Sequence, residues 1–221
     1  MRHSIRPVIH LFIGVISWVS LGQQADVLEY NWESSPAYFS QSFPDQEIVG
    51  IKNHIQTEFV YDSEGNLNQY YLEHKIFWLN SDKKIEEYNK VYIPLDADSQ
   101  IMVHKARVVS SKGKITELSE NQFLSAQDEE TQKNYKYFAF EGLEKGSFIE
   151  YFFVEKEEPS YNGTKINLQY SFPQNEVSFT LTSPRNLIFK TKGYNGLATS
   201  ELDTLLPGKN RWKLDSQPVE G

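Results

Sequence analysis

Beyond residue 22, the leading candidates for chemistry at neutral pH are three histidines and one glutamate. His54, His74 and His104 each lie in a segment with strand-like alternation, and none stands two or four residues from another. Metal-binding histidines usually share such a spacing. Folding could still bring these histidines together, but we expect each ring to be satisfied by a neighbouring side chain. The sequence therefore predicts no metal site and no cofactor.

Glu150 interrupts the apolar face that Phe148 and Phe152 would share in a strand. An unpaired carboxylate is costly to bury, so this position has two interpretations. One is a functional acid with a raised pKa. The other is a structural glutamate that faces an edge or is held by hydrogen bonds. We expect the second, because unpaired charges are rarely buried.

Asp96 and Asp98 form a D-x-D pair that could begin a calcium-binding loop. Such a loop needs a glycine at its sixth position and a glutamate at its twelfth, where this sequence has Ile101 and Arg107. We therefore expect a solvated turn. The G-x-S-x-G, P-loop and H-E-x-x-H motifs are absent from the sequence, and no cysteine is available as a thiol nucleophile. The sequence predicts no catalytic residue.

The composition argues against two classes of protein. The formal net charge is -8 and the lysines and arginines are not clustered, which argues against nucleic-acid binding. The mean hydropathy of -0.55 excludes a polytopic membrane protein. A hydrophobic content of 39% is ample for the core of one domain.

The first 22 residues have the layout of a secretory signal peptide. The basic start "MRHSIR" precedes the apolar run "PVIHLFIGVISWVSL", and the small residues Ser20 and Gly22 stand at its end. The alternative is an uncleaved N-terminal anchor, but the run is short for a membrane span. We expect cleavage after Gly22, export to the periplasm or cell surface, and no transmembrane span in the mature chain. Without cysteine, an exported domain has no disulfides, so burial must hold it together.

Beyond the signal peptide, residues 23–47 show no sustained period and predict an irregular lead-in, with at most one helical turn near "PAYFSQ". Strand-like segments with turn signals between them then recur over residues 48–221. The expected strands are 54–62, 69–79, 85–94, 101–110, 135–141, 148–154, 166–172, 177–183, 187–193 and 210–214, and 119–133 could hold a short helix. This pattern predicts an all-β sandwich of two packed, mainly antiparallel sheets.

The stretch "KGSFIEYFFVEKEEP" (145–159) predicts the centre of that sandwich. Phe148, Phe152 and Val154 would point to one side of the strand, while Ile149, Tyr151 and Phe153 would point to the other. A strand that is apolar on both faces must be covered on both faces.

Several stretches resemble an uncharacterised domain of bacterial envelope proteins that lies N-terminal to a transglutaminase-like (cysteine-peptidase-like) core. They are "LEHKIFWLNSDKKIEEYNKVYIPLDADSQIMVHKARVVSSKGKITEL", "LEKGSFIEYFFV", "QYSFPQNEVSFTLTSP" and "RWKLDSQPVEG". The residues that match the family's central strand and closing strand are Gly146, Ser147, Ile149, Glu150 and Tyr151, then Trp212 and Pro218. The resemblance implies an immunoglobulin-like β-sandwich, with the catalytic cysteine, histidine and aspartate in a following domain.

These observations favour a non-catalytic exported domain that docks on, positions or regulates a transglutaminase-like domain in cis or in trans. The alternative is a glycan- or peptide-binding module of the cell envelope, since the chain has 13 tyrosines, 14 phenylalanines and 4 tryptophans. A row of exposed aromatic side chains on one solvated sheet would favour binding, whereas buried, scattered ones would favour a scaffold. An independent hydrolase would require the histidines to converge with carboxylates in a cleft.

Overall fold

The computed structural model describes residues 24–36, 38, 45–96, 98–160, 163–203 and 206–216. The expected signal peptide and Pro218 lie outside these residues, as does most of "PAYFSQ". Among the described residues, no helix has both the length and the apolar character that crossing a membrane requires.

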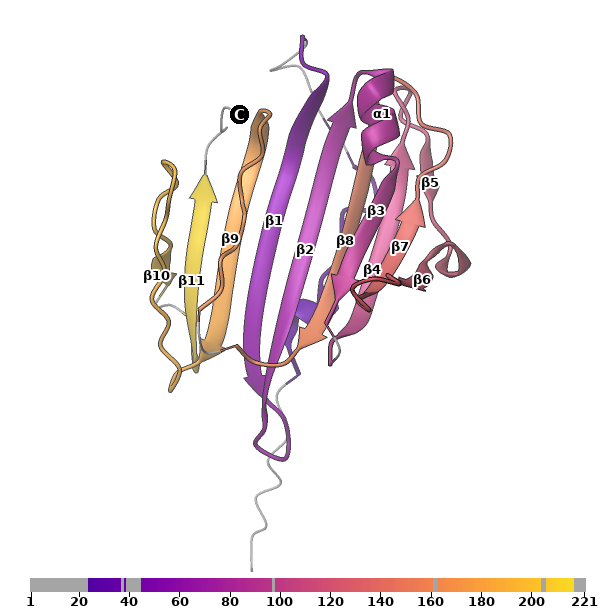
Figure 1. Cartoon of the computed structure of the whole chain (residues 1–221). Coiled ribbons are helices and arrows are strands. Elements are labelled where there is room, and N and C mark those ends of the chain that lie inside the picture. Colours follow the sequence, from indigo (N-terminus) through magenta and orange to yellow (C-terminus); the bar gives the residue numbers. More distant parts are fainter. Residues whose placement is uncertain are drawn as a thin grey trace, which may run out of the picture.

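Two sheets build the fold, and they confirm the predicted all-β sandwich (Figure 1). The strands are β1 (Ile48–Tyr61), β2 (Leu67–Leu79), β3 (Lys90–Leu95), β4 (Gln100–Val109), β5 (Ile115–Glu117), β6 (Leu124–Gln127), β7 (Asn134–Ala139), β8 (Ser147–Glu157), β9 (Gln174–Pro184), β10 (Glu201–Asp203) and β11 (Lys209–Ser216). The helices are η1 (Asp26–Glu29), α1 (Asp82–Tyr88) and η2 (Glu120–Gln122).

The large sheet has eight strands in the order β10-β11-β9-β1-β2-β8-β4-β5, and the small sheet has the order β3-β7-β6. Neighbouring strands pair antiparallel, except that β1 and β9 run parallel. The mainly antiparallel arrangement is therefore as predicted.

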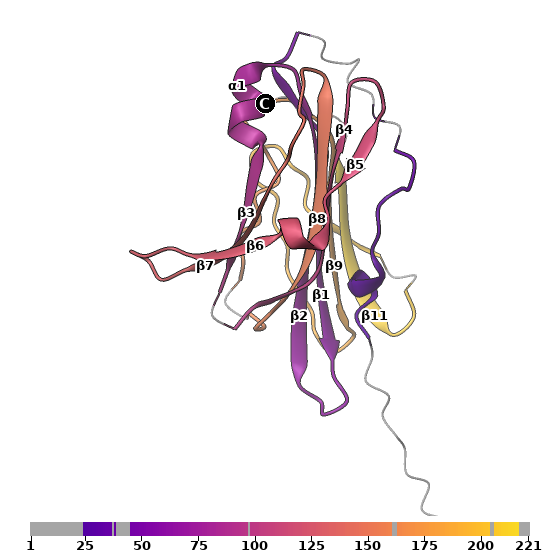
Figure 2. The same cartoon turned by 90° about the vertical axis from the view of Figure 1, so that its right-hand side faces the viewer.

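Strand β8 lies inside the large sheet, between β2 and β4, and is covered on both faces, as its sequence predicts. Ile149, Tyr151 and Phe153 belong to a cluster that also contains Phe138 of the small sheet. The opposite face of β8 is covered by the chain that precedes β1, which packs around Val154. Figure 2 shows the two covers on opposite sides of the large sheet.

Two expected strands, 166–172 and 187–193, are wrong. Both segments are irregular and lie over the half of the large sheet that the small sheet leaves open, where Leu168 joins Phe179 and Trp212 in a second apolar cluster. Side chains take the place of a ladder: Asn53 Nδ2 and Gln174 Nε2 donate to the Leu168 carbonyl at 2.9 and 3.1 Å. In these two segments the alternating side chains pack onto the large sheet, and the backbone does not pair as a strand within it.

The region around α1 also departs from the sequence prediction. The expected strand 85–94 begins with the end of α1, whose N-cap Ser81 accepts a hydrogen bond from the Lys84 backbone N–H at 3.2 Å, and only then becomes β3. The expected helix within 119–133 is reduced to the single 3₁₀ turn η2, which is followed by β6 and a hairpin. The short strands β5 and β10 were not predicted.

Candidate functional site

Residues 24–36 and 38 form an N-terminal strap that lies across one face of the large sheet (Figure 2). Its first turn is η1, held at a buried charge: the Val27 N–H donates to Glu58 Oε2 at 2.9 Å. Lys209 Nζ binds the other oxygen of Glu58 at 2.9 Å and Asp26 Oδ2 at 2.7 Å. Because Glu58 is fully buried, these donors replace the water that its carboxylate loses.

A cluster of three buried ionisable groups lies beneath the rest of the strap. Glu150 on β8, Arg107 on β4 and His74 on β2 are at most 3% exposed. Arg107 stands directly opposite Glu150 in the β4–β8 ladder, and its Nε donates to Glu150 Oε2. His74 Nε2 lies 2.9 Å from Glu150 Oε1. The three central strands thus place both charges and the imidazole on the face that the strap covers.

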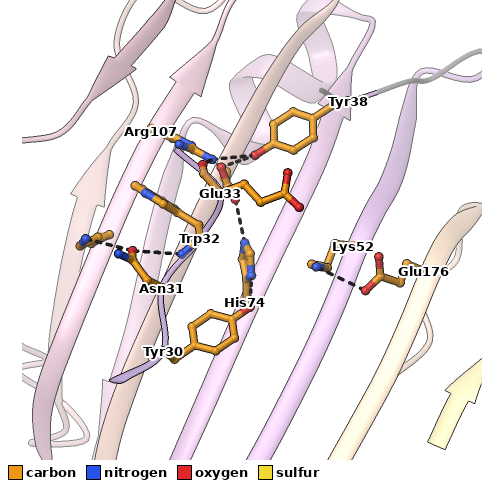
Figure 3. Close-up of polar contacts among 11 residues, drawn as sticks. Tyr30, Asn31, Trp32, Glu33, Tyr38, Lys52, His74, Arg107 and Glu176 are labelled. Carbon is orange, nitrogen blue, oxygen red and sulfur yellow. Dashed lines mark hydrogen bonds and ion pairs between the residues drawn. The ribbon is translucent and has the colours of Figure 1, made fainter. Parts of the chain in front are cut away.

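The strap completes this cluster with its own side chains (Figure 3). The Tyr38 hydroxyl donates to Glu150, and the Tyr30 hydroxyl lies 2.5 Å from His74 Nδ1. Arg107 Nη2 donates to the Glu33 carbonyl at 2.8 Å. The guanidinium carbon of Arg107 lies 4.1 Å from the centre of the Trp32 ring, a cation–π contact.

The electrostatics of the cluster favour one ion pair and a neutral histidine. Burial alone would raise the pKa of Glu150, but hydrogen bonds from His74, Tyr38 and Arg107 together bring it below its ordinary value. Burial lowers the pKa of His74 although Glu150 opposes this shift. A neutral His74 donates from Nε2 to Glu150 and accepts at Nδ1 from Tyr30, whose own pKa burial raises.

This arrangement is suited to holding the strap and not to proton transfer. Glu150 is ionised at neutral pH and receives donors from His74, Arg107 and Tyr38, so it has no proton to give and little basicity. The hydrogen bonds to Glu150 match the expected hydrogen-bonded glutamate, and they do not favour an acid with a raised pKa. Arg107 Nη1 is buried and has no hydrogen-bond partner among the described residues.

His54 and His74 are neighbours on one face of the large sheet, whereas His104 lies apart from them. His54 stands opposite His74 in the β1–β2 ladder, and its Nδ1 lies 2.9 Å from Ser178 Oγ. Burial, then the charge of Lys52 and the neighbouring His74, lower the pKa of His54 to about 4. His104 packs against Phe123 in the other layer, and its Nε2 lies 3.0 Å from Glu120. His54 and His74 thus have hydrogen-bond partners, as expected, whereas His104 Nε2 is close to Glu120 but makes no hydrogen bond among the described residues.

The remaining candidates from the sequence have structural positions. Asp96 and Asp98 are exposed in the turn between β3 and β4, as predicted. Gly146 has a positive φ of 85° in the turn into β8, which explains its glycine. Ser147 is fully buried, and its Oγ accepts from the Glu144 N–H at 3.1 Å. Trp212 is buried in the cluster on β9 and β11.

Sequence reasoning missed the partners of Glu150. A signal for Arg107 existed, because it interrupts the apolar run of its strand as Glu150 interrupts its own, and two such opposite charges predict a cross-strand pair. Tyr30, Trp32 and Tyr38 carry no such signal, because the strap has no period that would reveal which side faces the sheet.

Apart from the strap and the cluster beneath it, two solvent-exposed surfaces of the described residues have features that could bind a ligand. Beside the strap, a polar groove of about 340 Å³ crosses β1, β9 and β11. Its lining residues are Tyr30, Lys52, His54, Glu176, Ser178, Thr180, Lys213 and Asp215. Lys52 and Glu176 form an ion pair at 3.4 Å on this surface (Figure 3). On the small sheet, Tyr92 is 58% exposed and stacks on Tyr137 with ring centres 5.7 Å apart.

Comparisons with known proteins agree with the fold. The family model DUF3857, a "Domain of Unknown Function with solved-structure structure", matches residues 66–220, which confirms the expected resemblance to a domain of unknown function. A solved structure from Parabacteroides distasonis, described as a "putative protease", has a TM-score of 0.67 at 16% identity, over 79% of this chain and 36% of that chain. This chain thus spans about a third of that structure. No match was found among curated proteins.

A second solved structure is aminopeptidase A from Legionella pneumophila in complex with aspartic acid. It has a TM-score of 0.37 at 10% identity, over 80% of this chain and 20% of that chain. Similarity at this level is too low to support an argument about fold or function.

Proposed function

This chain belongs to the DUF3857 family of domains of unknown function, and from that premise we propose that it is a non-catalytic exported β-sandwich that docks on or positions a transglutaminase-like or peptidase domain. The observation that carries the proposal is the sealed state of its ionisable centre. Arg107 and His74 are buried and bonded to the buried Glu150, the strap packs over all three, and none of them lines either pocket found among the described residues.

The similarity to the Parabacteroides distasonis structure supports the choice of partner. The matching region makes up about a third of that protein, so a domain of this fold occurs there beside further polypeptide. The absence of cysteine from this sequence fits the proposal, because a cysteine-dependent reaction would need a nucleophile from another domain.

Export is part of the proposal and is supported by the N-terminal sequence. Removal of residues 1–22 would leave the strap whole, because the described strap begins at Gln24 and reaches its first anchor, Lys209, through Asp26. Expression of the full gene in a bacterial host, followed by N-terminal sequencing of the periplasmic protein, tests this. A chain that begins at Met1 in the membrane fraction would contradict it.

Co-purification and an activity assay test the docking function. The chain from residue 23 is mixed with the transglutaminase-like domain that follows it in the full-length protein or is encoded beside it. We expect a stable complex on size exclusion, and a change in the KM or kcat of the catalytic domain on a peptide substrate. No complex and unchanged kinetics would refute the proposal.

A second candidate, a glycan- or peptide-binding module, is favoured by the stacked pair Tyr92 and Tyr137 on the solvated face of the small sheet. Exposed aromatic rings can stack on sugars or on apolar side chains. Titration with soluble peptidoglycan fragments, followed by tyrosine fluorescence, tests the glycan form. Binding that Tyr92→Ala abolishes would support it, and no saturable signal would exclude it.

A further inference from the structure

Sheet edges expose unpaired N–H and C=O groups, and proteins usually protect them. The two sheets described here have four edge strands. On the large sheet, β5 and β10 are only three residues long, and β10 also carries Glu201 and Asp203. On the small sheet, β3 contains Lys90 and Pro94. Short length, charge and proline are the usual protective devices, so three of the four edges have one.

Strand β6 is one residue longer than β5 and β10, and it has neither charge nor proline. Its sequence is Leu-Ser-Ala-Gln, without charge or proline, and all four residues are exposed. It follows η2 and leads into a hairpin that extends away from the large sheet (Figure 2). An uncharged and exposed edge is the kind that can accept another strand.

The hydrogen-bond register identifies the groups that β6 offers. The Asp128 N–H donates to the Lys133 carbonyl at 2.9 Å, which makes these two residues a hydrogen-bonded pair. Such pairs alternate along an antiparallel ladder, so Ala126 and Leu124 also bond toward β7. Ser125 and Gln127 therefore direct their N–H and C=O groups away from β7, toward the free edge.

The side chains on either side of this edge differ in chemistry. On the outer face, Leu124 is 47% exposed and lies in one cross-strand row with Tyr137 and Tyr92. Ala126, Tyr135 and Pro94 form the next row. A strand added to β6 would continue both rows, so its outward side chains would meet an apolar surface.

The inner side of the same edge has one acid, Asp96, in its pocket, and Lys136 stands opposite Ser125 in the β6–β7 ladder. Leu95, Asp96, Ser99, Ser125 and Gln127 are among the residues that line a pocket of about 400 Å³ there. The pKa of Glu157 is raised to about 7, mainly by burial and then by the charges of Glu155 and Asp96. Negative charge near Asp96 is therefore not fully compensated. The hairpin tip "DEETQK" (128–133) adds three acids and one lysine.

We propose that the free edge of β6 is a docking site for an extended polypeptide segment of the partner, with alternating apolar and basic side chains. Its backbone pairs with Ser125 and Gln127, its apolar side chains join the row of Leu124 and Tyr137, and a lysine or arginine enters the pocket beside Asp96. This inference rests on the proposed docking function only in assigning the segment to the peptidase-like domain.

A labelled peptide of alternating lysine and valine probes the edge in the chain from residue 23, by fluorescence anisotropy. Ser125→Pro removes one outward N–H without a ladder bond, and Ser125→Thr is its matched control. We expect the proline variant to weaken binding at least about tenfold and the threonine variant to leave it unchanged. Asp96→Asn should weaken binding and reduce its sensitivity to salt. Circular dichroism and urea midpoints verify that each variant is folded.

A second peptide tests whether charge attraction alone explains binding. It has the same lysines but prolines in place of two valines, so it keeps the charge and loses backbone N–H groups. Equal binding of both peptides, equal binding by the Ser125→Pro protein, or no binding of the lysine–valine peptide would each overturn the inference. A wild-type dimer that Ser125→Pro converts to a monomer would also overturn it, because a second copy would then be the occupant.

The two proposals can fail separately. If Ser125→Pro still co-purifies with the transglutaminase-like domain as the wild type does, the docking function stands and β6 is the wrong surface. If the lysine–valine peptide binds through Ser125 but the catalytic domain forms no complex, the edge inference stands and the docking function fails.

Discussion

Replacement of Glu150 by glutamine should be among the most destabilising single changes in this domain. The change keeps the size of the side chain but removes its charge, and it leaves the guanidinium of Arg107 buried without its counter-ion. Loss of one partner from a buried ion pair costs about 3–5 kcal/mol, because the remaining charge is left without water and without compensation. That is a large part of the roughly 5–15 kcal/mol that stabilises an ordinary domain.

The magnitude follows from the burial of the whole cluster. Arg107 is 0% exposed, so it cannot turn toward solvent when Glu150 is neutral. The amide nitrogen of a glutamine would also meet donors, because Arg107, Tyr38 and His74 all donate to the present carboxylate. Urea unfolding at pH 7, followed by circular dichroism and tryptophan fluorescence, measures the loss.

Glu176→Gln is the matched control on the same face of the sheet. Glu176 pairs with Lys52 at 3.4 Å, but its side chain is 53% exposed, so the change should cost no more than about 1 kcal/mol. A double variant, Glu150→Leu with Arg107→Met, should recover at least half of the loss, because removing both charges avoids an uncompensated one. A cost for Glu150→Gln equal to that of Glu176→Gln, or a double variant that is worse than the single one, would refute the reasoning.

Three further changes test other charges by urea unfolding. Burial and nearby acids raise the pKa of Glu157 from an ordinary 4.5 to about 7, so between these pH values the folded state binds more protons than the unfolded state. The free energy of unfolding therefore falls as the pH rises through this window. Glu157→Gln should remove this dependence and raise the free energy of unfolding by about 2 kcal/mol at pH 8, with no change at pH 4. Burial lowers the pKa of His54 from 6.5 to about 4, so the folded state binds fewer protons and the free energy of unfolding falls as the pH drops through this window. His54→Asn should abolish about 2 kcal/mol of that fall. An unchanged pH profile would contradict the assignment. Lys209→Met leaves the buried Glu58 without its counter-ion, so it should lower the free energy of unfolding by about 3 kcal/mol and speed amide exchange in η1. Full protection of η1 would be inconsistent with an anchor at this lysine.

Periodicity predicted the elements whose pattern reports pairing and burial together. The hairpin of β1 and β2 is one example, because alternation on both strands flanks a turn in which Gly65 takes a positive φ of 85°. Strand β8 is another, since nothing except burial on both faces explains its composition. The same reasoning fails at 166–172, because alternation reveals a buried side and does not reveal whether the backbone is bonded by a ladder or by side chains such as Asn53.

The candidate site was predicted only in part, for a related reason. A glutamate in a buried strand indicates that it has a partner. Arg107 could have been predicted as that partner, because it interrupts the apolar run of the neighbouring strand. The hydroxyls of Tyr30 and Tyr38 come from a segment without regular structure, and only the folded chain shows where such a segment lies. Contacts between irregular chain and a sheet have no period to read.

The two covers of the large sheet differ in what they leave available for binding, and this difference connects the sealed cluster with the proposed docking edge. The strap belongs to no sheet, so side chains must hold it in place. Three charged side chains of the sheet beneath it bond to the strap: Glu58 holds η1, while Glu150 and Arg107 hold the residues that follow. The small sheet holds its place through Ile93 and Phe138, which point inward. Its outer face and the exposed edge of β6 lie away from that core, so the proposed partner would bind there without disturbing it.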